Sequence, residues 1–209
     1  MVRRSLVAVM VLAGAGVAGA DVTVPAVIGS NMVLQREMAV PIWGWASPGE
    51  KVTVTVGEQS VAATADEAGK WSVKLAAMKA GGPFEVTIAG TNTIKLSNVM
   101  VGEVWLCSGQ SNMVLPTWNT LNAKEEAAAA KDLPIRFFSV PGSITREPQK
   151  DTKAKWQVCD PGSAGGFSAV GVLLWAACNQ GIESAGGDDE CVDEWQRDSG
   201  VDSARGVGD

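Results

Sequence analysis

Short alternations of apolar and polar residues fill the chain from Asp21 to about Asn98. Valine, isoleucine, threonine and tryptophan recur at every second position, and turn residues such as Ser47-Pro48-Gly49 separate the runs. A period of two is typical of antiparallel strands that bury one face. The runs span 32–34, 39–45, 51–56, 60–65, 70–75, 84–89 and 93–97. The pattern therefore predicts an all-β, sandwich-like domain at residues 21–98.

The pattern changes at Val99. The run VMVGEVWLCSG is apolar apart from one acid and stops at Gly109, which is typical of a strand buried on both faces of a parallel sheet. Residues 121–132 favour a helix, and 134–140 read as a second buried strand. Strand, helix and strand in this order predict the start of an α/β layer.

We place this incomplete layer at residues 99–171, with an exposed loop at 141–155 within it. The predicted fold class is therefore α+β overall, with the all-β domain first. From residue 172 to 209 the chain turns acidic and glycine-rich, and beyond Trp175 it sustains neither helical nor strand periodicity. This predicts a divergent tail that is disordered or poorly packed.

Residues 1–20 carry Arg3 and Arg4, then an apolar stretch that ends in small residues at Ala20. This order is typical of a secretory signal peptide. We expect a secreted or periplasmic protein that has no membrane segment after cleavage. In such a compartment the cysteines can form disulfides.

Charge and cysteine content exclude several classes of function. A net charge of -6 and the lack of a basic run argue against nucleic acid as a partner. The chain has no histidine and no CxxC pair, so we expect no metal site and no cofactor. Three pairings of the four cysteines remain open, and Cys107 is equally compatible with a buried free thiol. The cysteines are Cys107, Cys159, Cys178 and Cys191.

Ser111 is the candidate catalytic residue. It follows the apolar run in the loop Gly109-Gln110-Ser111-Asn112, where α/β sheets present catalytic groups. Gly109 permits a tight turn, the Ser111 N–H can donate to an oxyanion, and Gln110 and Asn112 can brace the loop. On spacing alone, an ordinary turn serine is the more frequent outcome.

The segment GEVWLCSGQSNM at 102–113 closely resembles the first block of the sialate O-acetylesterase family, a branch of the SGNH hydrolases. The segments at 31–54 and 156–171 also resemble this family, so the resemblance spans about Val22 to Gly171. It implies an SGNH, flavodoxin-like α/β domain and a carbohydrate acetylesterase. It also implies that Ser111 is the nucleophile and its own N–H an oxyanion donor, with Gly109, Gln110 and Asn112 as loop support.

In this family the serine removes acetyl esters from sugar hydroxyls, with a histidine and an aspartate of a later block as its base. That block is missing here, so we expect the truncated chain to be inactive. The resemblance also ends abruptly after Gly171, and a shifted reading frame is one hypothesis for the change. The implied partner is an acetylated carbohydrate, and the oligomeric state stays open.

A secreted carbohydrate-binding β-domain without catalysis is the alternative function. Its candidate residues are Trp43, Trp45 and Trp71, because aromatic rings stack on the apolar faces of sugars. Packing in the core or between domains is the favoured interpretation of these three residues.

The signal-peptide prediction is tested by N-terminal sequencing. When the full chain is expressed with an export pathway, the secreted product should begin at Asp21, because the small residues before it suit signal peptidase. An exported product that retains Met1, or a chain that stays in the cytoplasm, would contradict the prediction.

Overall fold

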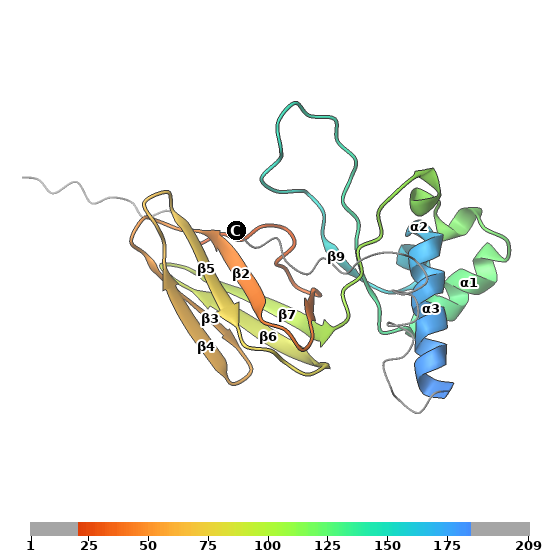
Figure 1. The fold of residues 1–209 in the computed structure, drawn as a ribbon, viewed down its shortest axis with the longest axis horizontal. Helices are drawn as coiled ribbons and strands as arrows, with labels where there is room; N and C mark the ends of the chain where they lie inside the picture. The colour runs from red at the N-terminus through yellow and green to blue at the C-terminus, as the bar shows by residue number, and fades with distance from the viewer. Residues whose placement is uncertain (1–20, 185–209) are drawn as a thin grey trace, which may run out of the picture.

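The computed structural model describes residues 21–184. The predicted signal peptide and most of the predicted acidic tail lie outside these residues. The described part is mostly β, with few helices; the strands up to residue 102 gather at one end and the helices at the other (Figure 1). None of the helices within residues 21–184 is long and apolar enough to span a membrane.

Each of the seven runs predicted as strands forms a strand. Five of them build one sheet in the order β1-β7-β6-β3-β4, while β2 and β5 pair as a second, antiparallel sheet. The strands are β1 (Val33–Gln35), β2 (Val40–Trp45), β3 (Lys51–Val56), β4 (Gln59–Thr64), β5 (Lys70–Leu75), β6 (Gly81–Ala89) and β7 (Thr93–Gly102).

Alternation along the strands buries one face of each sheet. In β5, Trp71, Val73 and Leu75 are buried while the lysines and serine between them are exposed. Both sheets contribute to one hydrophobic cluster, and β2 and β5 lie over the larger sheet in Figure 1. This shared cluster is what holds the two layers together.

One strand pair departs from the antiparallel prediction. β1 pairs with β7 in parallel, with Val33 opposite Met100 and Gln35 opposite Gly102. The prediction was wrong here because the two strands are distant in sequence, so no hairpin turn constrains their relative direction. Pattern alone identifies a strand but not its neighbour.

Gly44 explains how the small sheet accommodates a large aromatic residue. Gly44 lies opposite Trp71 in the β2–β5 pair, and a Cβ at Gly44 would lie 2.9 Å from the Trp71 ring and 2.1 Å from the Thr23 carbonyl oxygen. The Thr23 and Trp45 main chains also exchange two hydrogen bonds, of 2.8 and 2.9 Å. The absence of a side chain at Gly44 therefore lets this segment pack closely.

The three candidate sugar-binding tryptophans do not share a face. Trp71 is 3% exposed and belongs to the core, whereas Trp43 is 40% exposed on the opposite face of its sheet. Trp45 is half-buried beside the Thr23 segment. Packing is thus confirmed as the role of Trp71, and a single sugar platform made of all three residues is wrong.

The second part of the chain is a small cluster of helices with a two-stranded sheet. Ala130, Ile135, Phe137, Cys159 and Val172 are buried in its own hydrophobic cluster. The Phe137 and Phe167 rings stack at 4.5 Å within it. Its elements are η1 (Ser111–Val114), η2 (Thr117–Asn119), α1 (Ala123–Ala129), η3 (Ala130–Asp132), β8 (Arg136–Phe138), β9 (Trp156–Val158), α2 (Pro161–Gly166) and α3 (Ala169–Ser184).

The structure departs from the predictions for this part in three places. The run from Val99 to Gly109 is not one buried parallel strand: β7 ends at Gly102, and Leu106 is 93% exposed. Within residues 21–184 no strand pairs with residues 103–108, and β8 pairs with β9 in antiparallel orientation instead. In the region predicted as tail, α3 continues to Ser184, because a helix that is already nucleated adds each further residue at low cost.

The loop between β8 and β9 connects the two parts. The Trp156 indole N–H donates to the Val27 carbonyl oxygen at 2.7 Å, and the Ala26 N–H donates to the Asp151 carboxylate at 2.9 Å. Trp156 also packs against the β-rich core. Most of the loop predicted at 141–155 is exposed, and it projects away from the rest of the described chain before it returns to β9 (Figure 1).

Gly44→Ala should destabilise the protein, because its Cβ would overlap the Thr23 carbonyl oxygen. The expected loss in the free energy of unfolding is about 1–3 kcal/mol, as for other overpacked sites. Urea unfolding measures it. Gly142→Ala is the matched control, since open space surrounds Gly142 and its φ is ordinary. Equal unfolding midpoints for the two variants would contradict this account of the packing.

Candidate functional site: the Ser111 loop

The Glu103 clamp, formed by Gln35, Arg36 and Glu103, holds the chain where it leaves β7. The Glu103 carboxylate accepts a hydrogen bond from the Gln35 side chain at 2.8 Å and pairs with the Arg36 guanidinium at 2.5 Å. The Val104 N–H donates to the Gln35 side-chain oxygen at 2.8 Å, and the Arg36 N–H donates to the Gly102 carbonyl oxygen at 3.0 Å. The last residue of β1 and the residue after it thus fix the direction in which the chain approaches Ser111.

The turn before Ser111 requires glycine. Gly109 has φ 145°, a conformation that other residues rarely adopt, and a Cβ there would lie 3.1 Å from Met113 Cγ. Gln110 is extended, and η1 begins at Ser111. The Met113 N–H donates to the Gln110 carbonyl oxygen at 2.9 Å, which closes the turn.

Ser111 lies at the exposed N-terminal end of η1. Within residues 21–184 its hydroxyl and its N–H make no hydrogen bond, so both are available to a ligand. The side chains of Gln110 and Asn112 are exposed, and the Asn112 carbonyl oxygen accepts a bond from the Leu115 N–H at 3.3 Å. Main-chain groups brace the turn in this structure, and bracing by the two side chains stays a prediction.

The Ser111 loop rests against the start of α3. The Ala169 N–H donates to the Leu115 carbonyl oxygen at 2.9 Å, and the Thr117 N–H donates to the Phe167 carbonyl oxygen at 3.0 Å. Thr117 is fully buried at this junction. The loop is therefore held at its start by Glu103 and at its end by residues beside α3.

Cys107 and Cys159 are free thiols in this structure. Burial raises the pKa of Cys107, and burial together with the nearby Asp160 raises the pKa of Cys159. The Cys159 thiol also donates to the Ala130 carbonyl oxygen at 3.0 Å. Raised pKa values keep both thiols protonated near neutral pH, so neither is suited to act as a nucleophile.

The part of the chain that the structure describes contains no cluster of three or more histidine, cysteine, aspartate or glutamate side chains that could hold a metal ion. At the Ser111 loop the available chemical groups are the Ser111 hydroxyl and its main-chain N–H. Such groups can attack a carbonyl carbon and stabilise the resulting oxyanion once a base removes the hydroxyl proton.

Sequence reasoning missed two features. One is the partner of Glu103, the one acid in an apolar run. A single charged residue in such a run could have indicated that it binds a specific partner, here Arg36. The other is a pocket lined by residues from 56–59 and 78–84, at the turn between β3 and β4. The sequence signal there is weak, because Phe84 follows the same alternation as its neighbours.

Comparison with known proteins relates the chain to one group of enzymes, although no family model matches it. It is 35% identical over 167 residues to the sialate O-acetylesterase of Mus musculus and 40% identical over 126 residues to that of Homo sapiens. These alignments cover 71% and 54% of this chain. They cover 31% and 24% of the two relatives, so the chain spans less than a third of the length of these curated relatives.

A solved structure agrees with these sequence matches. A carbohydrate acetylesterase from Xanthomonas citri superposes with a TM-score of 0.73 at 34% identity, over 79% of this chain and 38% of that one. Sequence and structure comparisons thus select the same group of proteins. Over the part that aligns, the chain belongs to the sialate O-acetylesterase family.

Proposed function

We propose that this chain carries the nucleophile loop of a carbohydrate O-acetylesterase, with Ser111 as the nucleophile. The observation that carries the proposal is the Ser111 turn itself. Its hydroxyl and N–H are exposed and unbonded within residues 21–184, in a loop held at both ends. The family supports the choice of an acetylated carbohydrate as substrate.

In the proposed reaction, Ser111 Oγ attacks the carbonyl carbon of an acetyl ester on a sugar hydroxyl. The Ser111 N–H donates to the oxyanion, the sugar hydroxyl leaves with a proton, and an acetyl-serine remains. Water then attacks this ester and releases acetate. Both steps need a base to accept a proton, because a serine hydroxyl is a weak nucleophile at neutral pH.

The chain has no histidine at any of its 209 positions. Among residues 21–184, Ser111 Oγ has no hydrogen-bonded lysine to replace it. Loss of a catalytic base lowers kcat by several orders of magnitude, about 10⁶ in one well-measured serine protease. We therefore propose that this chain alone turns over slowly or not at all.

We also propose an organisation and a location that fit this function. The β-rich part is a sandwich-like domain, and the part that carries Ser111 is the start of an SGNH-type α/β domain. Their separate hydrophobic clusters support this division. The signal-like residues 1–20 support export, which would bring the protein to extracellular or periplasmic glycans.

A carbohydrate-binding β-domain without catalysis is the second candidate function. The pocket between residues 56–59 and 78–84 favours it, since this site lies in the β-rich part. Trp43 provides a further exposed aromatic side chain, although on a sheet face that Trp71 does not share.

Chemical rescue tests the role of Ser111. With p-nitrophenyl acetate in plain buffer, the wild-type chain and Ser111→Ala should release p-nitrophenol at equal rates. Added imidazole should raise the wild-type rate on the order of 10-fold above that of Ser111→Ala. This is a part of the ~10²–10⁴-fold rate enhancement that a positioned base contributes. Initial rates at increasing imidazole concentration measure the difference.

Ser108→Ala is the matched control, because Ser108 is another exposed serine of the same loop. It should behave as wild type. Rates that rise equally in wild type and Ser111→Ala would contradict the nucleophile proposal. Turnover in plain buffer that Ser111→Ala abolishes would support the nucleophile and overturn the proposal of inactivity.

A further inference from the structure

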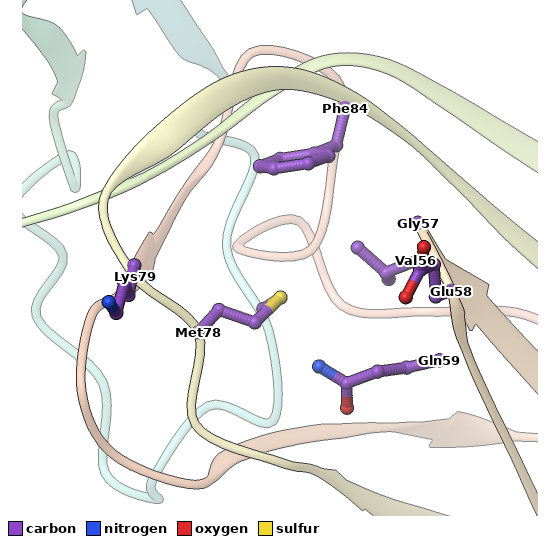
Figure 2. A pocket seen from close by; sticks show the side chains of 7 residues that line it. All are labelled: Val56, Gly57, Glu58, Gln59, Met78, Lys79 and Phe84. Atoms are coloured by element: carbon purple, nitrogen blue, oxygen red, sulfur yellow. The ribbon is translucent and has the colours of Figure 1, made fainter.

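A pocket of about 300 Å³ opens at one end of the five-stranded sheet, in the β-rich part of the chain. Figure 2 shows side chains from the β3–β4 turn, from the segment after β5 and from β6 around one space. This volume is at the lower end for small-molecule sites, which start at ~300 Å³. The lining residues are Val56, Gly57, Glu58, Gln59, Met78, Lys79 and Phe84.

Hydrogen bonds hold the segment that forms one wall of the pocket. The Gln59 side chain donates to the Ala76 carbonyl oxygen at 3.2 Å and accepts from the Ala76 N–H at 2.7 Å. On the other side of the same segment, the Glu37 N–H donates to the Met78 carbonyl oxygen at 2.8 Å. The wall that contains Met78 is therefore fixed before binding, which reduces the entropic cost of ordering a ligand site.

The pocket combines an apolar interior with a polar rim. In Figure 2 the Phe84 ring lies across one side of the space, and the Met78 side chain extends into it from another. Val56 is buried, whereas Glu58 and Lys79 are exposed and lie on opposite sides in this view. One carboxylate acceptor and one ammonium donor thus lie at opposite sides of the space, with the Phe84 ring across a third side in this view.

A sugar ring fits this combination. It presents a face of C–H groups that can lie against an aromatic ring, and its edge carries hydroxyls that both donate and accept hydrogen bonds. The charges of Glu58 and Lys79 balance, and the chain as a whole carries a net charge of -6. This balance favours a neutral sugar, because an acidic glycan would be repelled by the rest of the protein.

We propose that this pocket binds one neutral sugar unit, as an attachment point for a glycan that is separate from the Ser111 loop. Phe84 stacks on the apolar face of the sugar, and Glu58 and Lys79 bind its hydroxyls. The choice of a glycan ligand rests on the proposed function, whereas binding in the pocket needs no chemistry at Ser111.

Saturation-transfer NMR and titration calorimetry on the full chain test this site. The neutral probes are xylotetraose and cellotetraose, and N-acetylneuraminic acid is the anionic probe. At least one neutral probe should bind saturably, and more tightly than the anionic one. Ser111→Ala should bind as wild type, so a failure of the nucleophile proposal and a failure of the pocket proposal give different results.

Phe84→Leu keeps an apolar side chain against the core but removes the flat ring. It should weaken neutral-sugar binding by about 3- to 10-fold, the contribution expected of an aromatic stacking contact. Glu58→Ala changes an exposed residue and should also weaken binding while leaving thermal unfolding unchanged. Trp43→Ala separates this site from the other exposed aromatic candidate for sugar binding: Trp43 lies outside the pocket, so its loss should leave binding unchanged if the pocket is the site.

Three results would overturn the proposal. The first is the absence of saturable binding to both neutral probes. The second is binding that Trp43→Ala weakens while Phe84→Leu and Glu58→Ala leave it unchanged. The third is tighter binding of the anionic probe, which would exclude a neutral sugar as the ligand class.

Discussion

The parallel pairing of β1 with β7, closed by the Glu103 clamp, is the constraint on which the rest of the structure depends. β7 belongs to the core of the β-rich part, and its C-terminal end leads directly into the Ser111 loop. Gln35 and Arg36 bind Glu103 just beyond the last paired residues. If this register changed by one residue, the side chains of β7 would exchange faces, and the exit of the chain toward Ser111 would shift with them.

Two further contacts make the Ser111 loop a part of the folded chain. The Leu115 and Phe167 carbonyl oxygens accept hydrogen bonds at the junction with α3, and Trp156 links the second part to the β-rich core. Since these contacts come from distant positions in the sequence, the loop depends on both hydrophobic clusters. The Ser111 motif therefore keeps a defined conformation even though the chain aligns with less than a third of the length of its curated relatives.

Local sequence patterns predicted where the strands lie better than which strands pair with each other. Period-two alternation located all seven strands of the β-rich part, because each packs one face against the shared cluster. It did not reveal that β1 is parallel to β7, a long-range choice that no local residue encodes. The apolar run through Leu106 was misread for the same reason: burial requires neighbouring strands, and residues 21–184 supply none at that position.

The site was predictable in part. The Gly109 turn follows from residue type, and the structure gives it the left-handed conformation that glycine allows. The clamp at Glu103 and the pocket beside Phe84 were not predictable, because each joins residues from separate strands and turns. The proposed role of Ser111 rests on family resemblance, on the exposure of this residue, and on its hydroxyl and N–H making no hydrogen bond within residues 21–184.

Mass spectrometry of the acetylated protein tests the central claim most directly. After incubation with an activated acetyl ester in imidazole buffer, peptide mapping should find one acetyl group on Ser111, because its hydroxyl and its own N–H make no hydrogen bond within residues 21–184 and can act as nucleophile and oxyanion donor. Ser108 should stay unmodified in the same peptide. Acetylation confined to lysines and the N-terminus, or equal on Ser108 and Ser111, would contradict the account.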